Sequence, residues 1–413
     1  MSNITIPLDI ESLEVISQVI DTDGNIILDV ESKKKETPCH KCGKPATILY
    51  GHSYVMTVEH TSIFDTPVYL RIKQVRYQCE HCNDHPTTTE KYDWIAQGGK
   101  ITKALEDFIL RHVIHSTIKD VARKLRISYK TICSVMNNRI GTEVDWSKYT
   151  NLHTLGIDEI SNRKGHKNYW TIISARTKEG DLSVLAVLSS RKQTEVKKFL
   201  ESIPEGLRKT VKSVCTDMHD GYISPVIEIF RRQVLVVDRY HVAKLYRKPL
   251  DKLRIKEMAR LKDELPAEEY AKLEGMMWIL RRKHECLTQA DKDKLSLLYQ
   301  YSPVLKKAHH YALKLTNIFN MHSKRKDALA KIERWVKSVK KSELTCFNSF
   351  IKTLKKYKGY IANYFKDRKN SGFVEGLNNK IKVAKRRCYG FFKTSSLFQR
   401  LFLDIQGYKM LAF

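Results

Sequence analysis

The middle of the chain contains an order of predicted elements that few folds share. Three stretches of alternating or continuous apolar residues predict strands at Leu152–Ile160, Tyr169–Ala175 and Leu182–Leu188, joined by short polar connections. A doubly wound sheet alternates strand and helix from its beginning, so three consecutive strands exclude it. The rest of the region predicts a helix at Thr194–Ser202, a strand at Val211–Thr216, a helix at Tyr222–Phe230 and a strand at Gln233–Val237.

The order β-β-β-α-β-α-β is that of a ribonuclease-H-like α/β core, in which the first and fourth strands are neighbours. Asp158 lies on the first of these strands, and Asp217 ends the fourth. Neighbouring carboxylates repel each other, so a bound divalent cation is the natural reason to place them together. We therefore expect Asp158 and Asp217 to bind magnesium in a two-metal site for phosphoryl transfer.

A third acidic magnesium ligand, Glu375, is expected on the helix that follows residue 370. Glu375 begins this helix, and Ser371 is a plausible N-cap. Asn379, Lys382 and Arg386 follow at helical spacing on the face of Glu375, where they would contact a DNA phosphate. A glutamate at a helix N-terminus can also serve only to stabilise the helix dipole.

Asp238 and His241 form an Asp-x-x-His pair directly after the fifth strand. They are accessory or alternative catalytic residues: a metal-binding pair, or a hydrogen-bonded pair that orients DNA or the catalytic carboxylates. Strand order favours Asp217 over Asp238 as the middle acid, because Asp238 lies one strand further out. Phosphoryl transfer of this kind needs no covalent intermediate, so Tyr240 is expected to pack rather than to act as a nucleophile.

Four of the nine cysteines form two C-x-x-C pairs, Cys39/Cys42 and Cys79/Cys82. An odd number of cysteines argues against a disulfide framework. Two such pairs supply four thiolates to one tetrahedral zinc ion, so we expect a structural zinc site. The alternatives are four reduced cysteines without metal, or substitution of a thiolate by one of three nearby histidines. These are His40, His81 and His85.

The region 119–139 predicts a helix-turn-helix. A short helix at Asp120–Leu125 is followed by a turn and by a second helix at Tyr129–Asn138, which Ser128 can cap. The N-terminal residues of a recognition helix reach the base edges of DNA. A plain helical hairpin with a solvated basic face is the alternative. The predicted DNA-binding residues of this region are Arg123, Lys124, Arg126, Ser128, Tyr129, Lys130 and Thr131.

The net charge of +28 favours a polyanionic partner over a neutral small-molecule substrate. Most of it lies in residues 242–370, which carry 32 Lys and Arg against 14 Asp and Glu and read as a helical insertion. We expect this insertion to clamp DNA without sequence preference. No apolar run is long enough for a membrane span and the N-terminus does not resemble a secretory signal, so a cytoplasmic, nucleoid-associated protein is expected.

Several motifs together resemble bacterial insertion-sequence transposases of the ISL-three family. The resemblance covers nearly the whole chain. It implies a DDE-type, magnesium-dependent catalytic domain that cleaves DNA at terminal inverted repeats and transfers the strand. It also implies Asp158 as the first acid and Glu375 as the last, and leaves the middle acid between Asp217 and Asp238. The motifs are the two C-x-x-C pairs, the helix-turn-helix, Gly156–Ile160, Thr216–Met218, Val237–Lys244 and Gly372–Gly390.

The fold class expected from these observations is multi-domain α+β. A homodimer or higher oligomer is expected, because two element ends must be joined in one complex. The alternatives are a transposase-derived DNA-binding protein without catalysis and a metal-dependent, structure-selective nuclease. The predicted parts are an acidic segment with a zinc-ribbon-like module (1–95), a helix-turn-helix domain (100–145), the first part of the catalytic core (151–241), the insertion (242–368) and C-terminal helices that complete the core (371–413).

Overall fold

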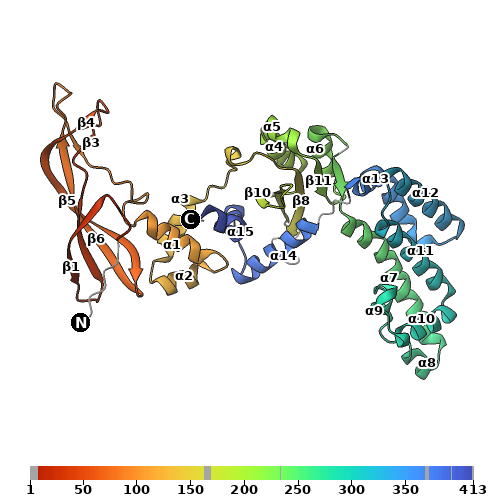
Figure 1. Cartoon of the computed structure of the whole chain (residues 1–413). Coiled ribbons are helices and arrows are strands. Elements are labelled where there is room, and N and C mark those ends of the chain that lie inside the picture. Colours follow the sequence, from red (N-terminus) through yellow and green to blue (C-terminus); the bar gives the residue numbers. More distant parts are fainter. Residues whose placement is uncertain (1–7, 162–168, 233, 368–371, 392, 412–413) are drawn as a thin grey trace. The chain divides into compact units, whose positions relative to one another are not determined.

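The computed structural model describes residues 8–161, 169–232, 234–367, 372–391 and 393–411. The chain forms two compact units, which are described separately (Figure 1). The first contains residues 1–142, 387–389 and 399–413, and the second contains residues 143–386 and 390–398. No helix in the described ranges is both long and apolar enough to cross a bilayer.

The first unit begins with a β-sheet in the order β1-β2-β6-β5, with β7 also paired to β6. Strands β1 and β2 are antiparallel, β2 and β6 are parallel, and β5 and β6 form a long antiparallel hairpin. The acidic segment is therefore part of the same sheet as the hairpin. The bounds are β1 Leu13–Ile20, β2 Ile26–Ser32, β3 Thr37–Pro38, β4 Pro45–Ala46, β5 Ile48–Ile63, β6 Thr66–Gln78 and β7 Thr87–Thr89.

Three helices follow the sheet: α1 (Lys103–Val113), α2 (Ile118–Leu125) and α3 (Tyr129–Arg139). The predicted helix-turn-helix is confirmed, and its second helix begins at the predicted cap. The Ser128 side chain accepts a hydrogen bond from the Thr131 N–H at 3.0 Å.

Helix α15 (Thr394–Met410) differs from the expectation that residues 371–413 complete the catalytic core. From Gln399 onward it belongs to the first unit, where Leu403 is buried in the core of α1–α3. The buried Arg400 guanidinium donates to the Val113 carbonyl at 2.7 Å, and Gln399 donates to the carbonyl of Ile140. The helix is apolar enough to fill this core, and nothing in its own sequence specifies the partner.

The second unit contains a five-stranded sheet in the order β10-β9-β8-β11-β12. Strands β8, β9 and β10 are antiparallel neighbours, while β8, β11 and β12 run parallel. The predicted order and the adjacency of the first and fourth strands are thus both observed. The bounds are β8 Thr154–Ser161, β9 Tyr169–Arg176, β10 Leu182–Leu188, α4 Gln193–Ser202, α5 Glu205–Thr210, β11 Ser213–Thr216, α6 Asp220–Phe230 and β12 Leu235–Val237.

The insertion is helical, as expected. Pro249 lies inside α7 and Gly359 lies inside α13, because one residue with poor helix propensity does not outweigh tertiary packing. Pro303 does begin a helix. The bounds are α7 Arg239–Glu264, α8 Ala267–Ala271, α9 Met276–Ile279, α10 Gln289–Tyr301, α11 Pro303–Asn320, α12 Arg325–Lys341 and α13 Asn348–Asp367.

Helix α14 (Gly372–Arg387) follows the insertion and contacts β8. Its Asn378 side chain contacts Asp158, and its Lys385 ammonium donates to the Ser161 carbonyl at 2.6 Å. The buried positions of α14 are Val374, Leu377, Ile381 and Ala384, a stripe at helical spacing. The predicted cap Ser371 and the predicted strand residue Gln233 lie outside the described residues.

Candidate active site and metal-binding module

Asp158 and Asp217 lie close together because β8 and β11 are parallel neighbours. Thr216 at the end of β11 is in register with Ile157, so the two acids occupy the next positions along adjacent strands. Burial raises the pKa of both carboxyls above the ordinary value of an aspartate. The charge of Asp158 raises the pKa of Asp217 further. A bound cation would offset both the burial of the two carboxylates and their mutual repulsion, so the pair is chemically suited to a divalent metal.

His241 and Asp238 extend this cluster. Electrostatic interaction with His241 lowers the pKa of Asp158 and of Asp217, opposing the effect of burial. The Asp238 carboxylate caps α7: its Oδ1 accepts from the Tyr240 N–H at 2.8 Å, and its Oδ2 lies 3.8 Å from His241 Nε2. Both carboxylate oxygens of Asp238 therefore have a partner, one in the helix cap and the other in His241.

Helix α14 approaches β8 closely because Gly156 has no side chain. A Cβ at this position would lie 2.5 Å from Val374 Cγ2 and 2.9 Å from Ser174 Oγ. The approach brings the Asn378 amide to Asp158, where it donates to Oδ2 at 2.6 Å. Asn378 was not predicted from the sequence. Because Asn378 and Asp158 are 220 positions apart, no pattern within α14 identifies this contact.

Glu375 and the predicted contact residues of α14 face solvent. Glu375, Asn379, Lys382 and Arg386 are all exposed. Within the described ranges, Asp158, Asp217 and Glu375 do not form a group whose ligand atoms lie within 4.8 Å of one another. Asp158 interacts electrostatically with Asp238 and His241, and Asp217 with Asp158 and His241, whereas Glu375 lies at the exposed start of α14. By the same 4.8 Å criterion, no three of Asp158, Asp217, Asp238 and His241 form a ligand group in the described residues.

The four cysteines of the two C-x-x-C pairs form one cluster, with all Sγ atoms within 4.8 Å of one another. Cys42 Sγ lies 3.6 Å from Cys79 Sγ, and Cys79 Sγ lies 3.9 Å from Cys82 Sγ. A tetrahedral zinc with Zn–S bonds of about 2.3 Å requires sulfur separations of about 3.8 Å. The cluster therefore fits a structural zinc ion, as expected.

The thiols of the cluster are perturbed unequally. The N–H groups of Cys42 and Lys41 donate toward Cys39 and lower the pKa of its thiol to about 6 against the effect of burial. Burial raises the pKa of Cys79, and contact with Cys42 raises that of Cys82 to about 12. Two of the alternative ligands have other contacts: His40 Nδ1 lies 3.0 Å from Thr88 Oγ1, and His85 Nδ1 lies 3.1 Å from the carbonyl of Cys79. Among the residues that the structure describes, no histidine is part of the cluster.

The helix-turn-helix presents a basic surface. The predicted contact residues are exposed, apart from the half-buried Thr131. Arg126 adopts a left-handed conformation (φ 56°) at the end of α2, which turns the chain sharply into α3. The exposed residues are Arg123, Lys124, Arg126, Ser128, Tyr129 and Lys130.

Comparison with known proteins agrees with this geometry. A family model described as a transposase, of the DDE type and the ISL3 group, matches residues 155–401. A second model, the helix-turn-helix domain of transposase family ISL3, matches residues 90–140. The transposase for insertion sequence element IS1001 of Bordetella parapertussis is 26% identical over 357 residues, covering 86% of this chain and 85% of its own. The transposase for IS1557 of Mycobacterium tuberculosis is 21% identical over 391 residues, covering 90% and 86%.

Proposed function

The chain belongs to the ISL3 family of transposases, and from this premise we propose that it cleaves DNA at the ends of an insertion sequence and transfers the freed strand to target DNA. The observation that carries the proposal is the half-buried acid pair formed by Asp158 on β8 and Asp217 directly after the parallel neighbour β11. Two neighbouring carboxylates can bind the divalent metal that phosphoryl transfer requires.

We assign the sheet of the second unit to a ribonuclease-H-like core. The order β10-β9-β8-β11-β12, with three antiparallel strands and a parallel half, supports this assignment. In such a core the site lies where the first and fourth strands end. Asp158 on β8 and Asp217 after β11 occupy this location.

Asp158 and Asp217 are the proposed magnesium ligands, and Glu375 at the start of α14 is the proposed third acid by family pattern. Magnesium, when bound, activates the attacking oxygen and stabilises the leaving 3′ oxygen. Asn378 holds Asp158 through the hydrogen bond to Oδ2, which fixes the direction of its carboxylate. His241, beside both acids, supplies positive charge when protonated.

The chemistry needs two displacements at phosphorus. In the first, a water oxygen forms a bond to the scissile phosphorus while the bond to the 3′ oxygen breaks, which leaves a 3′-OH and a 5′-phosphate. In the second, this 3′-OH attacks a target phosphodiester and displaces its 3′ oxygen. No protein nucleophile is required, which is consistent with a site built from carboxylates and one amide.

Recognition of the element ends is assigned to the first unit. The exposed N-terminal residues of α3 would read base edges, while the basic residues of α2 and of the insertion would bind phosphates. The zinc ion would hold the end of the β5–β6 hairpin. Synapsis of two ends requires a homodimer or higher oligomer acting on chromosomal DNA.

The test is cleavage and joining of DNA that carries the inverted repeats flanking the coding gene. Wild-type protein with magnesium should release a 3′-OH end and join it to a second DNA. Asp158→Asn and Glu375→Gln should both abolish cleavage, while the control Asp263→Asn, an exposed acid on α7, should remain active. Retained cleavage in Asp158→Asn and Glu375→Gln would overturn the proposal.

A further inference from the structure

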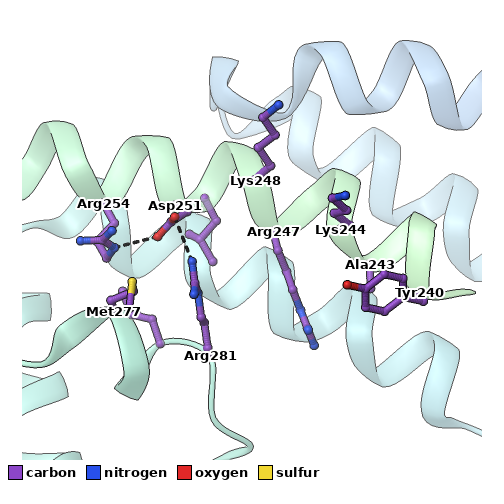
Figure 2. A pocket seen from close by; sticks show the side chains of 11 residues that line it. Tyr240, Ala243, Lys244, Arg247, Lys248, Asp251, Arg254, Met277 and Arg281 are labelled. Carbon is purple, nitrogen blue, oxygen red and sulfur yellow. Dashed lines mark hydrogen bonds and ion pairs between the residues drawn. The ribbon is translucent and has the colours of Figure 1, made fainter. Parts of the chain in front are cut away.

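A groove runs along the first four turns of α7 (Figure 2). It has a volume of about 500 Å³ and lies between residues 240–254 of α7 and residues 277–281. We call it the α7 groove. The first residue of α7 follows Asp238, so one end of the groove lies within two residues of the cap that contacts His241.

The α7 groove is strongly cationic. Five basic side chains and one acidic side chain line it. The acid, Asp251, accepts from Arg254 Nε at 2.9 Å and from Arg281 Nη2 at 3.0 Å, so it is shared by two guanidinium groups (Figure 2). The other three cations are exposed and have no ion-pair partner in the described part of the chain. They are Lys244, Arg247 and Lys248.

Tyr240 lies at the end of the groove nearest the acids, and it does not pack as expected. The residue is 54% exposed, and its ring meets the His241 ring edge-on, with centroids 5.6 Å apart and planes at 87°. The sequence could not show this exposure, because the residue follows a buried strand. An exposed aromatic ring beside unpaired cations is the arrangement that binds single-stranded nucleic acid, since bases stack on the ring and phosphates pair with the cations.

We propose that the α7 groove binds the DNA strand that flanks the scissile phosphate, with an unpaired base stacked on Tyr240. Lys244, Arg247 and Lys248 bind the phosphates that follow. This inference rests on the proposed cleavage function, because it places the groove next to the reacting phosphate. Tyr240 to Arg254 spans 14 residues, about 21 Å of helix, which corresponds to about six nucleotides at 3.4 Å each.

The test compares two probes that differ only in unpaired nucleotides. One is a fluorescein-labelled blunt duplex, and the other is the same duplex with six unpaired thymidines at one end. Binding of the full chain is measured by fluorescence anisotropy at several potassium chloride concentrations without divalent metal. Wild-type protein is expected to bind the tailed duplex more tightly than the blunt one.

Variants separate stacking from charge. Tyr240→Ala should weaken binding of the tailed probe by about 5- to 100-fold and leave blunt-duplex binding unchanged, while Tyr240→Phe should bind both as wild type. Arg247→Ala should reduce the salt slope for the tailed probe by about 0.7, one single-strand phosphate contact. Lys252→Ala, an exposed lysine of α7 outside the groove, should have no such effect.

The inference is wrong if Tyr240→Ala weakens both probes equally or neither, or if Arg247→Ala and Lys252→Ala change the salt slope alike. These outcomes leave the proposed function standing, because the assay contains no divalent metal and measures no cleavage. Conversely, if the protein failed to cleave and join DNA in the assay of the proposed function, the difference in affinity between the two probes would be unchanged.

Discussion

Replacing Gly156 with alanine tests how closely α14 must approach β8. The added Cβ would lie 2.5 Å from Val374 Cγ2, whereas ordinary contacts begin at 3.4 Å, so the helix must retreat by about 0.9 Å unless the side chain moves. Overpacking of this kind costs about 1–3 kcal/mol of stability. A misplacement near 1 Å at a catalytic site can reduce the rate about 100-fold, because Asn378 and Glu375 move with the helix.

The assay is cleavage of repeat-ended DNA, with the thermal unfolding midpoint measured in parallel. Val374→Ala alone removes two buried methyl groups and should cost about 1.6 kcal/mol, with a smaller effect on rate. The double variant Gly156→Ala/Val374→Ala should recover part of the lost activity, since the atom at 2.5 Å is gone. If the effects of the two substitutions are instead additive, the contact between these residues does not position α14.

Three further predictions concern other parts of the chain. Cys79→Ser, or removal of zinc by a chelator, should unfold the hairpin end of the first unit and release one zinc per chain. The control Cys286→Ser should retain the metal, and a folded, zinc-free module would contradict the assignment of a structural zinc site. Magnesium affinity should rise as the pH increases above the ordinary pKa of an aspartate, because burial raises the pKa of Asp158 and Asp217 and the metal must displace their protons. Titration calorimetry at several pH values that shows no such rise would count against the acid pair. Ser128→Ala should remove the cap of α3, lower stability by about 1 kcal/mol and weaken binding of DNA that carries the inverted repeats. Ser128→Asp should keep the cap. Equal DNA binding by Ser128→Ala and wild type would argue against α3 as the recognition helix.

Local patterns predicted the parts of the fold that depend on short-range order. Alternating apolar residues predicted β9 at Tyr169–Ala175, and the strand ends at Arg176. The order of elements predicted β8 beside β11 and therefore the pairing of Asp158 with Asp217. The spacing of the cysteines predicted their cluster, because each C-x-x-C turn brings two sulfur atoms together.

Features that depend on long-range packing were not predictable. From Gln399 onward, helix α15 packs into the core of α1–α3 instead of completing the catalytic core, because an apolar helical face does not specify its partner. Asn378 was missed because attention to the solvent-facing residues of α14 does not reveal which polar side chain meets a carboxylate 220 positions away. The exposure of Tyr240 likewise depends on how α7 leaves the sheet.

The most direct test of the catalytic assignment compares Asp217→Asn with Asp238→Asn in the same cleavage assay. Asparagine caps helices as well as aspartate does, so Asp238→Asn should keep the hydrogen bond from the Tyr240 N–H and leave the start of α7 intact. We expect Asp217→Asn to abolish magnesium-dependent cleavage and Asp238→Asn to retain measurable activity. Loss of cleavage in Asp238→Asn together with activity in Asp217→Asn would contradict this assignment.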